Sequence, residues 1–234
     1  RRERDERVGD PLEAELPVSH VPGHDPHATS PVLSRIDVIL HRPQSSENVG
    51  AVARAMKNFG LSRLVLVAPK RWEPARARTL AVQSEEILDA ARLCLTLDEA
   101  IEPYALVVPT TERAVAGRPA PLGPRDTARL LVRRATEAPV ALLFGAEASG
   151  VSNALLSRFA EYSSIPSDPA RRSLNLAQAV LLYAWELYQE SGSVPALVRP
   201  DEPAPGERPA SHKLLTLLRE RARGLFLANG FLNP

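Results

Sequence analysis

Residues 36–60 read IDVILHRPQSSENVGAVARAMKNFG, and this stretch decides the fold class. Its first five residues are mostly apolar and predict a buried strand. Ser45 or Ser46 then provides a helix N-cap, and Gly60 provides a helix end. Between them, apolar side chains recur at helical spacing, at Val49, Val52, Ala53, Met56 and Phe59. A strand that leads directly into an amphipathic helix is the building unit of an α/β fold.

The same alternation of apolar runs and helical patterns continues to about residue 190. Further strands are predicted at residues 64–68, 105–109, 140–144 and 162–165. Helices are predicted at residues 79–93, 126–136, 153–159 and 173–190, with a short segment at 98–102 before the third strand. In the last helix Ser173 is the expected N-cap, and Asn175 lies in the first turn although it is a poor helix former. We therefore predict a mostly parallel sheet with flanking helices.

The parts of the chain outside this alternation differ in composition. Residues 1–33 predict a disordered or loosely attached extension, and residues 34–192 are the predicted α/β domain. The proline-rich residues 193–210 predict a linker, and residues 211–234 predict a C-terminal helix. Because such a short helix needs a surface for its leucine-rich face, we expect it to pack on a partner subunit or to add to a grip on RNA.

Length and composition exclude several classes of protein. The 234 residues are 44% hydrophobic and 24% charged, which is typical of folded, soluble chains. The longest apolar runs are far shorter than the roughly 18 residues of a membrane span. The first residues carry no apolar core of a signal peptide, and Cys94 is the only cysteine. These features predict a cytoplasmic protein whose single thiol is buried and structural.

The formal net charge is only +1, but the charge is unevenly distributed. Residues 31–72 carry seven Lys and Arg against two acidic residues. We predict a basic face there that binds RNA phosphates, formed by Arg42, Lys57, Arg63 and Arg71.

Three polar segments follow predicted strands, where open α/β sheets bind their ligands. They lie at residues 48–54, 142–151 and 165–177. The second resembles a phosphate loop but lacks the Lys of a Walker motif, and no G-x-G-x-x-G is present. Taken one by one, these segments are also explained by a surface arginine, a glycine turn and a helix cap.

Their order and spacing carry more information. Asn48-x-Gly50-x-x-x-Arg54, Phe144-Gly145-x-Glu147-x-x-Gly150, and Ile165-Pro166 with Ser173-Leu174-Asn175 resemble the three motifs of the SpoU (TrmH-like) RNA 2′-O-methyltransferases. The resemblance covers roughly residues 34–190. The loop Thr110-Thr111-Glu112-Arg113 is most similar to the TrmJ-type tRNA enzymes of that family.

The resemblance implies an α/β fold with a C-terminal trefoil knot, S-adenosyl-L-methionine as cofactor, and a homodimer. It also implies tRNA as substrate, at an anticodon-loop nucleotide if the chain is TrmJ-like. The residues it assigns to catalysis are Asn48, Arg54, Glu147, Ser173 and Asn175. Those it assigns to the cofactor are Thr110, Thr111, Gly145, Glu147, Gly150, Ile165, Pro166 and Leu174, and it adds Arg113 to the RNA-binding residues.

Two alternatives to tRNA methylation remain at this point. The chain could methylate rRNA, or it could be a non-catalytic RNA-binding module that retains the fold. An enzyme acting on a free nucleotide is disfavoured because the nucleotide fingerprints are missing. No metal is expected, since a sulfonium already carries an activated methyl group.

Overall fold

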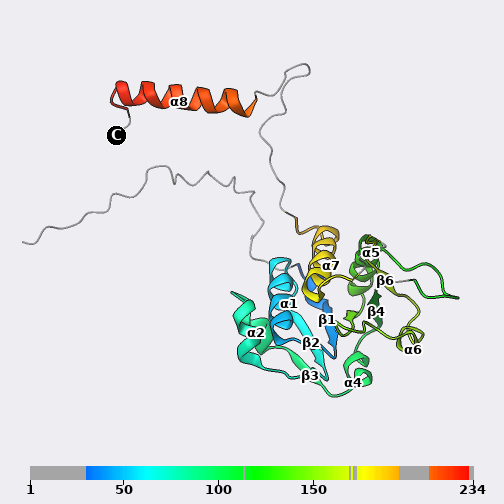
Figure 1. Cartoon of the computed structure of the whole chain (residues 1–234). Helices are drawn as coiled ribbons and strands as arrows, with labels where there is room; N and C mark the ends of the chain where they lie inside the picture. Colours follow the sequence, from blue (N-terminus) through cyan, green and yellow to red (C-terminus); the bar gives the residue numbers. More distant parts are fainter. Residues whose placement is uncertain (1–29, 113, 169, 171–172, 195–210, 232–234) are drawn as a thin grey trace, which may run out of the picture. The chain divides into compact units, whose positions relative to one another are not determined.

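The structure is a computed structural model that describes residues 30–112, 114–168, 170, 173–194 and 211–231. The chain divides into two compact units, and the second begins at Pro195. The second unit contains helix α8 (His212–Ala228), whose N-cap Ser211 accepts a hydrogen bond from the backbone N–H of Leu214. The first unit contains the sheet and is drawn with its elements labelled in Figure 1.

The first unit is built on a sheet of six strands in the order β3-β2-β1-β5-β4-β6. All of its pairings are parallel, as the alternation of strands and helices predicts. Leu40 of β1 lies between Leu66 of β2 and Phe144 of β5. The strands are β1 (Ile36–His41), β2 (Arg63–Val67), β3 (Arg92–Cys94), β4 (Leu106–Thr111), β5 (Val140–Phe144) and β6 (Ser163–Ser164).

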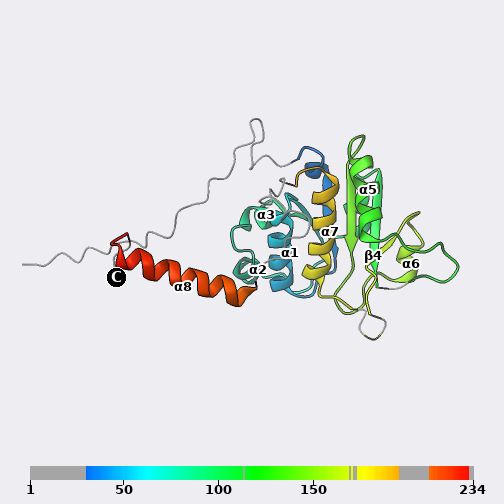
Figure 2. The same ribbon diagram turned by 90° about the horizontal axis from the view of Figure 1, so that it is seen from above.

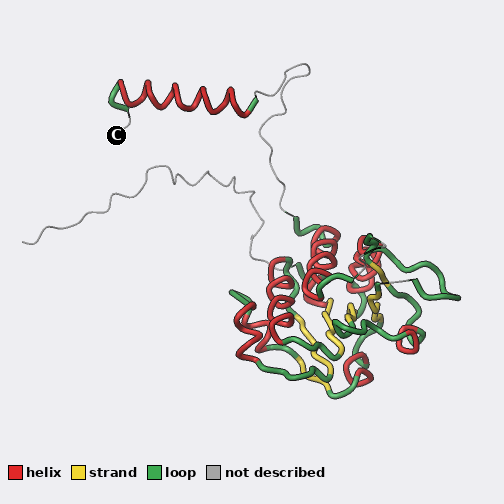
Figure 3. Tube along the Cα trace, viewed as in Figure 1, coloured by secondary structure: helices red, strands yellow, loops and turns green. Residues whose placement is uncertain are grey.

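Helices cover both faces of this sheet (Figure 3). Three of them, α1, α7 and α5, lie side by side on one face, as the two views in Figures 1 and 2 agree. The opposite face packs against α4 and the segment around α6. The helices are α1 (Ser46–Asn58), α2 (Pro74–Leu80), α3 (Glu85–Asp89), α4 (Leu97–Ile101), α5 (Pro124–Ala135), α6 (Asn153–Leu156) and α7 (Leu176–Glu190), after a 3-10 turn at Leu33–Arg35.

The core explains why the strands read as nearly continuous apolar runs. Successive side chains of β1, such as Val38 and Ile39, are buried on opposite faces of the sheet. A parallel sheet that is covered on both sides needs apolar residues at both sets of positions. Met56, Leu131 and Tyr183, from α1, α5 and α7, fill the larger of the two cores.

Two predictions about the elements are wrong. The predicted helix at residues 79–93 is broken, because Gln83 adopts a left-handed φ of 61° after α2 and Arg92–Cys94 pairs with β2 as an edge strand. The last helix begins at Leu176, and its N-cap is Asn175 instead of Ser173. Cys94 is buried, as predicted, and burial raises the pKa of its thiol.

The topology points to one edge of the sheet. From β1 the chain continues to β2 on one side, whereas from β5 it continues to β6 on the other. Such a reversal opens a crevice between the carboxyl ends of the two adjacent strands, and ligands bind there in open α/β sheets. The first turn of α1 and the loop after β5 meet at this place.

Candidate functional site

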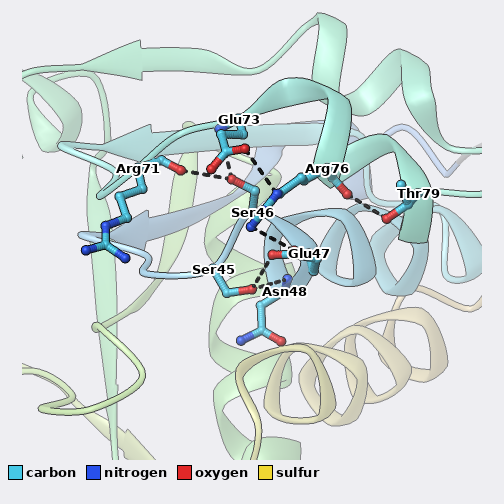
Figure 4. Close-up of polar contacts among 8 residues, drawn as sticks. All are labelled: Ser45, Ser46, Glu47, Asn48, Arg71, Glu73, Arg76 and Thr79. Carbon is cyan, nitrogen blue, oxygen red and sulfur yellow. Dashed lines mark hydrogen bonds and ion pairs between the residues drawn. The ribbon is translucent and has the colours of Figure 1, made fainter.

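The first turn of α1 is tied down by two adjacent serines. Ser45 is the N-cap, and its Oγ accepts a hydrogen bond from the backbone N–H of Asn48 at 3.1 Å. Ser46 is buried, and its hydroxyl donates to the carbonyl of Arg71 and accepts from the backbone N–H of Glu73 (Figure 4). The turn is therefore fixed from both sides before any substrate arrives.

Glu147, in the loop after β5, binds the same turn of α1. Its Oε2 accepts from the backbone N–H of Gln44 at 2.8 Å. Its Oε1 accepts from the backbone N–H of Ser45 at 3.3 Å and from Nδ2 of Asn48 at 3.1 Å. A carboxylate beside a helix N-terminus is stabilised by the free amide groups there. Since both oxygens are engaged, this carboxylate holds Asn48 in place.

Asn175 joins the third segment to the first. Its Oδ1 caps α7 by accepting from the backbone N–H groups of Ala177 and Gln178 at 2.9 and 3.4 Å. Its Nδ2 donates to Oδ1 of Asn48 at 3.1 Å. Glu147, Asn48 and Asn175 thus form one chain of hydrogen bonds through the three segments that the sequence singled out. Capping also explains why a poor helix former stands at Asn175.

The two glycines of the second segment are required by the backbone. A Cβ on Gly145 would lie 2.2 Å from the carbonyl carbon of Gly150, which leaves no room for a side chain. Gly150 itself has a left-handed φ of 59°, and its N–H donates to the carbonyl of Ala146 at 2.7 Å. The loop therefore closes on itself beside Glu147.

A cavity of about 410 Å³ lies against this loop. Most of the residues predicted to bind a cofactor line it: Thr110, Thr111, Gly145, Glu147, Gly150, Ile165 and Leu174, together with Ser173. Pro166 is not among its lining residues.

The cavity also has walls that the sequence did not predict. Phe144 and Tyr183 line it and pack edge to face with ring centroids 5.7 Å apart. The hydroxyl of Tyr183 is hydrogen-bonded to Ser163, and burial raises the pKa of Tyr183 to about 12. Glu112 adds an exposed carboxylate. Tyr183 reads in sequence as an ordinary core residue of a helix, so no pattern could have marked it.

Arg54 does not line this cavity. It lies six residues after Asn48, which is about 9 Å along the helix and about 120° around it. Its side chain is exposed and has no hydrogen bond or ion pair to any described residue. Gly50, four residues before Arg54, is buried against α2, and a Cβ there would lie 1.9 Å from the carbonyl oxygen of Ala77.

The four cations predicted to form one basic face lie at two edges of the sheet. Arg42 and Arg71 follow the carboxyl ends of β1 and β2, at the same edge as the cavity. Lys57 ends α1 and Arg63 begins β2 at the opposite edge, where they pair with Glu86 and Asp37. A single basic face is therefore wrong. Arg113 lies outside the described residues.

The described ranges contain neither of two other kinds of site. None of their helices has both the length and the apolar character that crossing a membrane demands. No three His, Cys, Asp or Glu side chains among these residues gather as a metal site would require.

Comparisons with known proteins agree with this geometry. The model of the SpoU rRNA Methylase family matches residues 35–185. The tRNA (cytidine/uridine-2′-O-)-methyltransferase TrmJ of Cronobacter sakazakii is 35% identical over 207 residues, which cover 87% of this chain and 83% of that protein. The tRNA (cytidine/uridine/adenosine-2′-O-)-methyltransferase TrmJ of Pseudomonas aeruginosa is 41% identical over 160 residues, 67% of this chain and 61% of the relative. The crystal structure of TrmJ from Z. mobilis superposes with a TM-score of 0.61 at 32% identity, covering 85% of this chain and 82% of the other.

Proposed function

Because the chain belongs to the SpoU rRNA methylase family, we propose that it transfers a methyl group from S-adenosyl-L-methionine to a ribose 2′-hydroxyl of tRNA. The observation that carries this proposal is the hydrogen-bonded chain of Glu147, Asn48 and Asn175 beside a cavity that is lined by the segments following β4, β5 and β6. The names of both TrmJ relatives support tRNA over rRNA as the substrate. A tRNA substrate would also place the protein in the cytoplasm.

The cavity fits the cofactor in size and chemistry. A volume of about 410 Å³ lies within the range of small-molecule sites. The tight loop from Gly145 to Gly150 lines the cavity, and Phe144 and Tyr183 offer an apolar wall for a purine. Thr110, Thr111, Ile165 and Leu174 would complete the pocket, with Pro166 setting the backbone next to Ile165. When bound, S-adenosyl-L-methionine supplies a methyl group activated by its sulfonium charge.

The protein's own residues would supply position and charge. Ser173 lines the cavity, and its hydroxyl makes no hydrogen bond to any described residue, so it is free to bind substrate. Asn48 is held by Glu147 and Asn175 and would orient the reacting groups. Such alignment raises the rate of methyl transfer. An arginine stays protonated in proteins, so Arg54 would stabilise the charge that develops on the 2′-oxygen, and a phosphate or water would accept the proton.

This role for Arg54 implies a homodimer, since the residue lies away from the cavity of its own chain. A second copy would bring the Arg54 of one chain to the cavity of the other. A further observation favours such pairing: Leu181, Leu182 and Trp185 on α7 are each about 40% exposed in the first unit. An apolar helix face of this kind is more stable when it is covered.

The remaining expectations belong to the same proposal. A trefoil knot would explain how Asn175 returns to α1 and meets Asn48. We retain the predicted boundaries at residues 34–192 and 211–234. Helix α8 presents Leu214, Leu218 and Leu225 at helical spacing, and pairing with a second copy would cover this face.

The test is a methyl-transfer assay with tritiated cofactor on tRNA and on rRNA fragments, combined with calorimetry of cofactor binding. We expect heat of binding at micromolar to millimolar cofactor, and labelled tRNA whose modified ribose resists alkaline cleavage. Label on rRNA alone would replace tRNA by rRNA as the substrate. A folded protein that binds no cofactor would contradict the methyltransferase function, and binding of tRNA without transfer would favour the non-catalytic module.

A second measurement tests the dimer. Light scattering at tens of micromolar protein should give twice the mass of one 25.5 kDa chain. A monomer that is fully active would leave Arg54 without access to the cavity and would overturn the shared site.

A further inference from the structure

Most cationic side chains among the described residues of the first unit are engaged by the protein itself. Arg63 and Arg78, for example, pair with carboxylates, and Arg118 donates to three backbone carbonyls. Among the residues described up to Val194, five cationic side chains have no hydrogen bond or ion pair: Arg42, Arg54, Lys70, Arg71 and Arg133. Three of these five, Arg42, Lys70 and Arg71, are exposed and follow the carboxyl ends of β1 and β2. We call these three residues the basic edge.

The backbone of the basic edge is strained. Arg42, Ala68 and Arg71 have left-handed φ angles of 56°, 42° and 51°, and they are three of the four non-glycine residues with positive φ in the described chain. Each such residue costs on the order of 1 kcal/mol or more, and such strain clusters at functional sites. The strain is therefore concentrated at the carboxyl ends of β1 and β2, where the three free cations also lie.

Hydrogen bonds hold the two loops of the basic edge together. The N–H of Arg42 donates to the carbonyl of Val67 at 2.7 Å, and the N–H of Lys70 donates to the carbonyl of Pro43 at 2.9 Å. The buried hydroxyl of Ser46 binds the backbone on both sides of Trp72. In Figure 4 the guanidinium of Arg71 points away from the cluster around Ser46. The cations thus project from a rigid backbone.

Electrostatics at this edge agree with an anionic ligand. Arg76 pairs with both neighbouring carboxylates, Glu47 and Glu73, so only one net negative charge remains beside the three cations of the basic edge. The positive field also acts on His41, whose pKa is lowered by burial and by the charge of Arg42. The adjacent N-terminus of α1 is already occupied by the Glu147 carboxylate, so the three side-chain cations are what this edge offers to an anion.

We propose that Arg42, Lys70 and Arg71 bind the phosphodiester backbone of the substrate RNA next to the nucleotide whose ribose enters the site. This inference rests on the proposed function, since it takes RNA as the substrate. Phosphate contacts supply most of the affinity for nucleic acids and fix the register of the bound strand. The rigid edge would position the strand beside Asn48, and it would do so without reading the sequence of the RNA.

The test compares two triple variants with equal loss of charge. One is Arg42→Ala/Lys70→Ala/Arg71→Ala. The matched control, Arg129→Ala/Arg133→Ala/Arg134→Ala, removes three exposed cations of α5, whose C-terminal end lies near the opposite edge of the sheet. Affinity for tRNA is measured by fluorescence anisotropy from 50 to 300 mM KCl, and cofactor affinity by calorimetry.

We expect the basic-edge variant to bind tRNA at least about tenfold more weakly near physiological salt. The slope of log K against log salt should fall by about 1 for each lost phosphate contact. The control should stay within about twofold to threefold of the wild type, and both variants should bind cofactor normally. Arg71→Lys should keep most of the affinity, because a phosphate accepts either cation.

Two results would overturn the inference in distinguishable ways. If the wild type methylates tRNA and the two triple variants bind it equally well, the basic edge does not contact RNA, although the proposed function stands. If the wild type neither binds nor methylates RNA, the proposed function fails and the basic edge fails with it.

Discussion

At the amino edge of the sheet Asp37 accepts hydrogen bonds from Arg63 and Tyr104 at 2.6 and 2.5 Å, whereas at the carboxyl edge Glu147 accepts three from amide groups of the α1 terminus. Asp37 forms an ion pair with an arginine, whereas Glu147 is hydrogen-bonded by amide groups alone. The carboxyl edge therefore keeps its cations free for an anionic substrate.

The two edges also differ in their cavities. The hollow at the amino edge is the larger, at about 840 Å³, and its charged lining residues include Lys57 with Glu86 and Arg63 with Asp37. The cavity at the carboxyl edge has about half that volume, but free polar groups such as the Ser173 hydroxyl line it. The candidate site therefore differs from the hollow at the amino edge in its unbonded polar groups more than in its volume.

The largest effect is expected for Arg54→Ala. Loss of a group that stabilises developing charge should lower the rate of methyl transfer by about a hundredfold or more, on the order of 3 kcal/mol. Cofactor affinity should stay within a few-fold, because Arg54 does not line the cavity. Arg133→Ala removes another exposed arginine, in α5; it is the control and should be nearly as active as the wild type. A variant that methylates tRNA at the parent rate would contradict the assigned role.

Gly145→Ala should abolish cofactor binding. The new Cβ would overlap Gly150, whose carbonyl oxygen lies 2.3 Å from the Cβ position, so the wall of the cavity must move. Gly150→Ala is the matched variant, because nothing lies within 4 Å of its Cβ and only a left-handed φ opposes it. Calorimetry should show loss of binding for the first and a change of less than about tenfold for the second. Equal binding by both variants would remove the loop from the cofactor site.

Glu147→Gln should lower methyl transfer by roughly tenfold to a hundredfold and should also destabilise the fold. An amide in place of the carboxylate presents N–H groups to N–H donors, which leaves at least one of three donors unpaired at about 1 to 3 kcal/mol. Glu86→Gln, which breaks only the exposed pair with Lys57, should change both quantities little. Activity assays and urea unfolding give the two readouts. If both variants lose activity equally, the two edges do not differ as the hydrogen bonds indicate.

Alkaline pH offers a further comparison, between Tyr104 at the amino edge and Tyr183 in the cavity. Burial is the main cause that raises the pKa of both to about 12, with Asp37 adding to the effect at Tyr104. The unfolded chain releases these protons near pH 10, so stability is present below pH 10 and lost as pH rises towards 12. For Tyr183 the loss is roughly 3 kcal/mol.

Urea unfolding of wild type and Tyr183→Phe at pH 9 and 11.5 measures this loss. The difference in stability between the two proteins should shrink at the higher pH. Saturating cofactor should delay the ionisation of Tyr183, followed by absorbance near 295 nm, and should leave that of Tyr104 unchanged. If the cofactor instead delayed the ionisation of Tyr104 and left that of Tyr183 unchanged, it would bind at the amino edge.

Local sequence was sufficient for elements whose ends carry their own signals. The strand Val140–Phe144 has the predicted bounds, and Ser45 caps α1, because an apolar run and a capping serine act within a few residues. The cap of α7 was misplaced because Ser173 and Asn175 are both competent caps. The choice between them depends on Asn48, which lies 127 residues away in the chain.

The spacing of the motifs in the sequence identified the site residues, but it did not show which of them are hydrogen-bonded to one another. The hydrogen bonds of Glu147 span about 100 residues and follow from the return of β5 beside β1. The basic residues do not form one face, because α1 runs antiparallel to β1 and Lys57 therefore lies at the opposite edge of the sheet from Arg42. The clustering of charged residues along the sequence does not show that the chain reverses direction between β1 and α1.

The smallest effect separates strain from charge at the carboxyl edge. Arg71→Gly and Arg71→Ala both remove the guanidinium, so they should weaken tRNA binding equally. They should differ in stability, because alanine keeps the cost of the left-handed φ of 51° and glycine does not. We expect Arg71→Gly to be more stable than Arg71→Ala by about 1 kcal/mol in urea unfolding, reduced by the greater freedom of glycine in the unfolded chain. Equal stabilities would mean that the loop relaxes at no cost, and the strain would then say nothing about function. A glycine variant that is more stable but binds RNA poorly would show that an arginine is kept there for its charge.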